Sequence, residues 1–138
     1  MKLKDFDFRI WDGKKYINNI KGGVYIHKIN DHIKCLNRNQ DCYDYEFELD
    51  DLDNSNLEIE LFTGLYDKKG KKVYENDIVK VKSLYDYFLA KISIHKEGTF
   101  YFEGKNGDYI GSLIYLVEDE GYTIETIGNI NENAELLK

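Results

Sequence analysis

Two carboxylates one residue apart have the clearest potential for chemistry in this sequence. Glu75 and Asp77 are separated by one residue, so on an extended strand both side chains would lie on the same face. Such a pair can perform general acid–base chemistry or bind a cation. No partner base, nucleophile or third ligand is evident nearby, and we therefore expect structural roles. Asp77 is expected to accept backbone N–H bonds where a loop enters a strand, and Glu75 to face solvent or pair with a lysine.

Four residues of types that bind zinc occur within sixteen positions. They are His27, His32, Cys35 and Cys42, in the spacing H-x4-H-x2-C-x6-C. Structural zinc sites commonly use closely paired cysteines, and this pattern contains no C-x2-C pair. We therefore expect histidines on strand surfaces and ordinary thiols, with no metal and no other cofactor. The serines and glycines do not match a nucleophile elbow or a phosphate-binding loop, and no catalytic residue is predicted.

The charged residues include two segments of opposite sign. Asp41 to Glu60 contains nine acids and no Lys or Arg, whereas Lys68 to Lys82 contains six lysines and two acids. The acidic segment is expected to be a solvated loop or a contact surface for a basic partner. The tip of the basic hairpin, with Tyr66 and Tyr74 on its stems, could contact nucleic acid or a nucleotide. The candidate partner-binding residues are Asp44, Glu46, Glu48, Asp50, Asp51, Lys68, Lys69, Lys71 and Lys72.

The composition is that of a packed globular protein. With 138 residues, of which 42% are hydrophobic, the chain can bury enough surface for an independent core. The net charge of −7 argues against general nucleic-acid binding, because an acidic surface repels phosphate. No apolar run is long enough for a membrane span, and the start lacks a signal-peptide pattern. With two cysteines and no disulfide framework, a cytoplasmic location is expected.

Apolar and polar residues alternate along much of the chain, as they do in half-buried strands. Phe6, Phe8 and Ile10 are one example, and a turn signal follows at Asp12-Gly13. Turn signals recur about every eight to twelve residues, which indicates a mainly β protein. The other predicted strands are Lys14–Ile17, Val24–Ile29, Ile33–Leu36, Leu57–Phe62, Val73–Tyr74, Ile78–Lys82, Phe88–His95, Thr99–Glu103 and Tyr122–Ile127.

The strands predict two parts with little helix. Residues 1–62 are expected to form an N-terminal β subdomain, which includes a variable acidic region and a long loop or irregular excursion over 37–56. Residues 63–138 are expected to form a small β-barrel of the Src-homology-3 (SH3) type, because five short strands suit a strongly bent barrel. Leu113–Val117 fits either a strand or a short helix, and Asn133 is expected to cap a helical turn.

Three blocks of sequence occur in the order found in a known family. Phe8–Asp12 reads FRIWD and is similar to the opening F-R-x-W-D. Thr63–Val79 reads TGLYDKKGKKVYENDIV, close to T-G-L-x-D-x-x-G-x-x-[IV]-Y-E-G-D-I-V. Ile127–Ile130 and Glu132–Leu137 are similar to the closing I-G-N-I-x-E-N-P-E-L-L. The chain thus resembles the YopX-like proteins of phages and prophages of Gram-positive bacteria, with Asn76 in place of the usual Gly and Ala134 in place of Pro.

The resemblance implies a two-part, largely β fold and a phage or prophage protein that acts inside the bacterial cell. It implies no catalytic residues. The region from Asn18 to Asn56 matches no block and is where targets would vary. We therefore expect a non-enzymatic accessory protein that binds a host protein, with the acidic segment as its contact surface. The alternatives are a nucleic-acid or nucleotide binder that uses the Lys68–Lys72 hairpin, and a structural homo-oligomer formed through strand edges.

Overall fold

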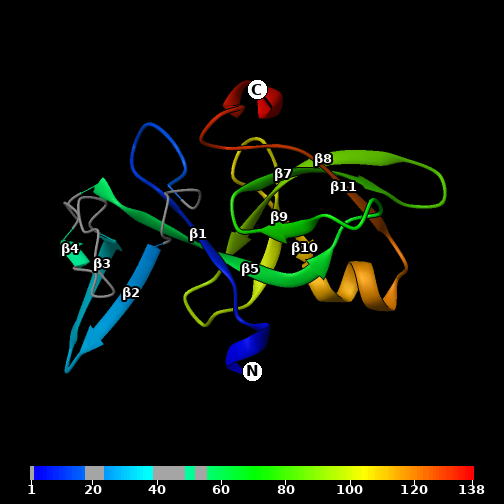
Figure 1. Cartoon of the computed structure of the whole chain (residues 1–138). Helices are drawn as coiled ribbons and strands as arrows, with labels where there is room; N and C mark the ends of the chain where they lie inside the picture. The colour runs from blue at the N-terminus through cyan, green and yellow to red at the C-terminus, as the bar shows by residue number, and fades with distance from the viewer. Residues whose placement is uncertain (1, 18–23, 39–48, 52–55) are drawn as a thin grey trace. The chain divides into compact units, whose positions relative to one another are not determined.

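The computed structural model describes residues 2–17, 24–38, 49–51 and 56–138 (Figure 1). The chain forms two compact units, which we describe separately. Met1–Phe8 and Leu61–Lys138 make up the large unit, and Arg9–Glu60 make up the small unit. The structure is mainly β, which confirms the predicted fold class. The predicted subdomain boundary after residue 62 and the SH3-like architecture stay predictions.

The large unit contains a five-stranded antiparallel sheet in the order β10-β9-β8-β7-β11. The first four strands pair in sequence, and β11 returns to pair with β7. A helical turn, η3 (Tyr115–Asp119), lies between β10 and β11, so the segment that fitted either a strand or a helix is helical. The strands are β7 (Asp77–Lys82), β8 (Tyr87–Ile94), β9 (Phe100–Glu103), β10 (Tyr109–Ser112) and β11 (Thr123–Asn129).

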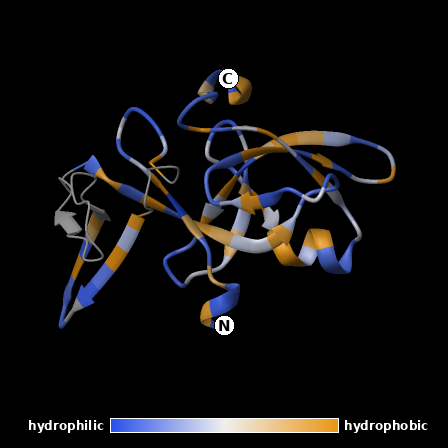
Figure 2. Ribbon diagram, in the orientation of Figure 1, coloured by the Kyte–Doolittle hydropathy of each residue, from blue (hydrophilic) through white to orange (hydrophobic). Residues whose placement is uncertain are grey.

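The core of the large unit lies against one face of this sheet. Alternate residues of a strand point to the same face, and Val79 and Val81 of β7 are accordingly both fully buried. Burial of each such side chain stabilises the fold by about 1.5–3 kcal/mol. Figure 2 shows hydrophobic residues along the strands and hydrophilic residues in several connections. The core residues are Val73, Val79, Val81, Ala90, Ile92, Phe102, Leu113 and Ile124.

The small unit contains a three-stranded antiparallel sheet in the order β2-β3-β4. The strands are β2 (Val24–Ile29), β3 (His32–Arg38) and β4 (Leu49–Asp51). The β2–β3 hairpin turns at Asn30, whose φ of 53° is a left-handed value that Asn tolerates well. β4 lies in the segment that was expected to be a long loop or an irregular excursion. It is a strand because its backbone pairs with the end of β3. Pairing between strands that are separated in the sequence by a long connection leaves no signal in the local periodicity.

A further sheet has the order β1-β5-β6, formed by β1 (Phe8–Trp11), β5 (Glu58–Tyr66) and β6 (Lys72–Tyr74). The predicted turn at Asp12-Gly13 is confirmed, with a φ of 99° at Gly13 and a bridge between Trp11 and Tyr16. Two 3-10 turns, η1 (Leu3–Asp5) and η4 (Ala134–Leu137), complete the elements of the described residues. No helix in this part of the chain has the length and apolar character that crossing a membrane requires.

Candidate functional site

The turn between β7 and β8 exposes two large apolar side chains on a constrained backbone. Leu84 is 92% exposed and Tyr85 is 96% exposed. The Ser83 N–H donates to the carbonyl oxygen of Asp86 at 2.9 Å, and the Asp86 N–H donates to Ser83 Oγ at 3.3 Å. Asp86 Oδ1 accepts the N–H of Tyr87 at 2.7 Å. We refer to Ser83–Asp86 as the Leu84–Tyr85 tip, because these bonds fix the turn while both side chains face solvent.

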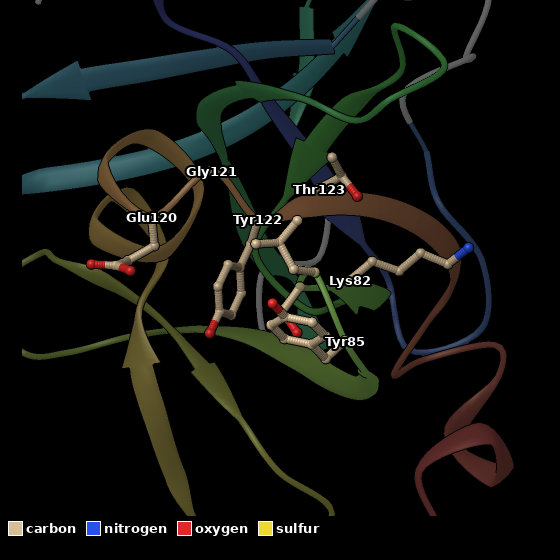
Figure 3. A pocket seen from close by; sticks show the side chains of 8 residues that line it. Lys82, Tyr85, Glu120, Gly121, Tyr122 and Thr123 are labelled. Carbon is tan, nitrogen blue, oxygen red and sulfur yellow. The ribbon is translucent and has the colours of Figure 1, made fainter.

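The Leu84–Tyr85 tip borders a cavity of about 430 Å³, which we term the tyrosine cavity (Figure 3). Tyr122 forms the inner wall: it packs against the core, and its N–H donates to the carbonyl oxygen of Leu116 at 2.9 Å. Figure 3 shows Tyr85 and Tyr122 next to each other, with Glu120 beyond Tyr122 and the Lys82 amino group pointing away from the rings. The lining residues are Lys82, Ser83, Leu84, Tyr85, Glu120, Gly121, Tyr122 and Thr123.

A carboxylate is fixed at the edge of the tyrosine cavity. The hydroxyl of Tyr115 forms a hydrogen bond with Glu120, and this bond, together with the negative charge of Glu120, raises the pKa of Tyr115. Glu118 and Asp119 precede Glu120 in the chain and are exposed. Aromatic walls with a few fixed polar groups are typical of binding sites. The cavity can therefore accept an apolar group beside a cationic one.

Leu84 and Tyr85 are not among the site residues predicted from the sequence. A signal was present, since Leu-Tyr occupies a turn where Gly, Asn or Asp is usual. Two adjacent large apolar side chains exposed at the tip of a turn form a candidate contact site.

Asp67, in the Thr63–Val79 block, organises the hairpin between β5 and β6. Its Oδ1 accepts the N–H groups of Lys69 and Lys71, each at 2.9 Å, and its Oδ2 accepts the N–H of Thr126 in β11 at 3.1 Å. Burial raises the pKa of Asp67, but these backbone hydrogen bonds outweigh it and hold the pKa below its ordinary value. Gly70 closes the turn with a φ of 83°. Asp67 is therefore a structural residue that joins the hairpin to the sheet.

The pair of carboxylates at 75 and 77 also has structural partners. Asp77 is 2% exposed, and its Oδ2 accepts the N–H of Tyr74 at 2.8 Å at the entry to β7. This confirms the role predicted for Asp77. Glu75 Oε2 accepts the backbone N–H of Leu61 at 3.4 Å, and its pairing with a lysine stays a prediction. Between them Asn76 has a φ of 69°, a conformation that Gly adopts without strain.

The structure places most of the predicted lysines next to carboxylates. Lys68 and Lys69 lie 2.9 Å and 3.0 Å from the two oxygens of Glu125, and Lys72 lies 2.8 Å from Asp7. Hydrogen bonds from the two lysines lower the pKa of Glu125 to about 2. The remaining lysine of the hairpin, Lys71, is exposed. A partner of this hairpin would compete with these ion pairs, and its role in binding stays a prediction.

Acid is expected to destabilise the folded chain as Glu125 becomes protonated. The pKa of Glu125 is depressed on folding, so its contribution is present above the ordinary pKa of 4.5 and is lost as the pH falls toward about 2. In thermal unfolding followed by circular dichroism, Glu125→Gln should flatten the dependence of Tm on pH in this range. Glu97→Gln, which changes an exposed carboxylate, should leave the slope unaltered. An equal slope in native protein and Glu125→Gln would disprove the role of the ion pairs.

Only two of the five acidic residues predicted to contact a partner belong to the described part of the chain. Asp44, Glu46 and Glu48 lie outside the described residues. Asp50 and Asp51 belong to β4, where Asp51 pairs with Leu36 and Asp50 with Asn37 of β3. The contact role of the acidic segment stays a prediction.

The residues of zinc-binding type are distributed over the β2–β3 hairpin. His27 pairs with Lys34, and His32 pairs with Ile29 at the turn. Cys35 is buried, and burial raises the pKa of its thiol. Cys42 lies outside the described residues. Within residues 2–17, 24–38, 49–51 and 56–138, no group of three or more His, Cys, Asp or Glu side chains is arranged to hold a metal.

The closing block of the sequence forms a hydrogen-bonded loop after β11. Asn129 is buried, and its Oδ1 accepts the N–H groups of Asn131 and Glu132 at 3.1 Å and 2.9 Å. Asn133 precedes η4, as expected, but its side chain does not cap that turn. Its Oδ1 accepts the N–H of Asn129 at 3.2 Å instead. An ideal Cβ built on Gly128 would lie only 2.6 Å from this oxygen, so only glycine fits without displacement.

In the small unit, the opening block contributes a buried ion pair. Arg9 Nε donates to Glu60 Oε1 at 2.6 Å, with side chains 14% and 1% exposed. The hydroxyl of Tyr16 donates to the same oxygen at 2.9 Å. The guanidinium of Arg9 also lies 4.7 Å from the centroid of the Tyr16 ring, within the range of a cation–π contact. Arg9 therefore has a structural role.

A family model described as YopX protein matches residues 7–138. The chain belongs to the YopX protein family. Its structure is similar to that of YopX from Bacillus subtilis, with 22% identity and a TM-score of 0.63 over 95% of this chain and 97% of that chain. It is also similar to protein EF1440 from Enterococcus faecalis, with 26% identity and a TM-score of 0.59 over 96% and 98%. No curated protein matches the chain.

The residues that match the YopX motifs have structural roles in this chain. Asp67 and Asp77 accept backbone N–H groups, Arg9 pairs with Glu60, and Asn129 organises the closing loop. In this chain the motif residues thus stabilise the fold. The Leu84–Tyr85 tip lies outside the three motif blocks.

Proposed function

We propose that this protein is a non-enzymatic accessory protein, encoded by a phage or prophage, that binds a host protein inside the bacterial cell. The observation that supports the proposal is the Leu84–Tyr85 tip, where two large apolar side chains are almost fully exposed beside the tyrosine cavity. Exposed apolar groups of this size are characteristic of protein contact sites.

The constrained turn makes the tip suitable for binding. Hydrogen bonds between Ser83 and Asp86 hold its backbone, so little conformational entropy is lost when a partner docks. Tyr85 is of a type enriched among the residues that dominate binding energy at interfaces. Burial of Leu84 and Tyr85 by a partner would each remove a large apolar area from water.

The hydrogen bonds of the motif carboxylates support a role other than catalysis for this protein. Asp67 and Asp77 bind backbone N–H groups within the fold, and Glu75 binds another. The paired state of Lys68, Lys69 and Lys72 favours a protein partner over nucleic acid for this chain.

We further propose that β7 to β11 form an SH3-like barrel. The order β10-β9-β8-β7-β11 and the helical turn before the last strand support this arrangement. In such a barrel the connections between strands carry the binding residues, in agreement with the position of the tip between β7 and β8.

Affinity capture from a host lysate tests the proposed function. The tagged native chain should recover one stoichiometric host protein that resists nuclease treatment. Leu84→Ser/Tyr85→Ser should lose it, because the partner no longer buries these side chains. The matched control is Leu3→Ser/Ile33→Ser, which removes two other exposed apolar side chains, 87% and 65% exposed, and should retain the partner.

Recovery that disappears with nuclease would overturn the proposal in favour of nucleic-acid binding. Equal loss in both double variants would show that the tip has no special role. Sedimentation of the purified protein tests the remaining alternative, since a structural protein that pairs through its strand edges would sediment as a stable homo-oligomer.

A further inference from the structure

We propose that the tyrosine cavity binds an extended peptide segment of the partner that carries a large apolar side chain next to Lys or Arg. This inference rests on the proposed function, and it adds the chemistry of the partner. Three features support it: the aromatic walls, the size of the cavity and the charges around it.

The aromatic walls define the place of the apolar side chain. Tyr122 packs against the core and is held by its bond to Leu116, so one wall is rigid. Tyr85 borders the cavity from the tip with its side chain almost fully exposed, and Figure 3 shows its ring next to that of Tyr122. Grooves lined by aromatic rings bind extended peptide segments of the polyproline type. The volume of about 430 Å³ accommodates one large side chain with adjoining backbone.

The charges define the place of the cation. Residues 106–137 contain seven acids and no Lys or Arg. Glu125 is neutralised by lysines of the hairpin. Glu118, Asp119 and Glu120 at the end of η3 are exposed, and the described part of the chain gives none of them an ion-pair partner. We refer to these three carboxylates as the acidic edge.

The positions of the two features set the orientation of the peptide. Figure 3 shows Glu120 on the far side of Tyr122 from Tyr85, and Lys82 extends away from both rings. An extended chain advances about 3.3 Å per residue. A peptide whose apolar side chain lies between the tyrosines therefore reaches the acidic edge within a few residues. The acidic edge would repel phosphate, which favours a peptide over nucleic acid.

The test uses short random peptides displayed as a library and selected at low salt against the full chain. Selected peptides should be enriched in Lys or Arg near a large apolar residue. Synthetic copies are then measured by fluorescence anisotropy. Glu118→Gln/Asp119→Asn/Glu120→Gln should weaken binding about tenfold at low salt, and the effect should shrink as salt is added. The matched control, Asp5→Asn/Glu97→Gln/Asp108→Asn, removes three exposed acids elsewhere and should leave the affinity unchanged.

The outcomes separate this inference from the proposed function. The inference would be overturned if the selected peptides required Leu84 and Tyr85 but lacked Lys and Arg, and if the acidic-edge variant bound them with unchanged affinity. The proposed function would then still stand. A library without binders, together with a captured host protein that depends on the tip, would do the same, because the partner would then present a folded surface. Peptides that bind equally well to Leu84→Ser/Tyr85→Ser would overturn both.

Discussion

Glu60→Ala is expected to lower the free energy of unfolding by about 3–5 kcal/mol. Glu60 is almost completely buried, and Arg9 and Tyr16 both donate to its Oε1. Removal of the carboxylate takes away the negative charge that lies 2.6 Å from the buried guanidinium of Arg9, and breaking a buried pair in this way costs more than the intact pair contributes. Urea unfolding followed by circular dichroism and tyrosine fluorescence measures the change.

Two further variants identify the cause of this loss. Glu58→Ala removes an exposed carboxylate from the same strand, β5, and should change the free energy of unfolding by less than about 0.5 kcal/mol. Arg9→Met/Glu60→Met replaces the pair by apolar side chains and should recover most of the lost stability, because neither position then carries a charge that must be buried. If Glu60→Ala cost no more than Glu58→Ala, the ion pair would have no role in stability.

Gly128→Ala is expected to cost about 2 kcal/mol, the second largest effect that we predict. Its new methyl group would lie 2.6 Å from Oδ1, 2.8 Å from Cγ and 2.9 Å from Cβ of Asn133. The short distance to Cβ means that rotation of the side chain alone does not relieve the clash. The loop after β11 must shift, and the bond from the Asn129 N–H to Asn133 is lost.

A double-mutant cycle separates the clash from other effects of the alanine. In an Asn133→Gly background the obstructing side chain is absent, so Gly128→Ala should cost much less than in the native chain. Gly104→Ala is the matched control, since its Cβ would meet no atom closer than 3.5 Å. Equal costs of Gly128→Ala in the two backgrounds would mean that close approach of Asn133 is not the reason for the glycine.

Much of the fold could be predicted because strands and tight turns leave local signals. The period of two identified most strands, and glycines 13, 70, 98 and 107 have the positive φ values that turns require. β4 was missed because its pairing with β3 is determined by contacts beyond the local pattern. The partner of Asn133 was misassigned for a similar reason, since a cap is the usual role of Asn before a helical turn.

The candidate site was harder to predict. The ion pairs of Lys68 and Lys69 with Glu125 join residues more than fifty positions apart, and they form because the β5–β6 hairpin is hydrogen-bonded to β11 through Lys68 and Asp67. The lysine pattern alone therefore indicated an exposed basic surface. The exposure of Leu84 and Tyr85 could not be predicted either, because large apolar residues of these types are usually at least partly buried. Only the geometry of the turn shows that both side chains face solvent.

The order of the strands has a consequence for synthesis in the cell. β7 to β10 are made before β11, and one edge of β7 has no partner until β11 is translated. During that interval the nascent chain presents the unpaired backbone of a strand in which three of six residues are apolar, and an unpaired strand edge promotes aggregation. The bond from Thr126 to Asp67 can form only at the same late step. Folding of the large unit is thus delayed until its last strand emerges from the ribosome, and a chaperone that shields β7 until then would raise the yield of folded protein.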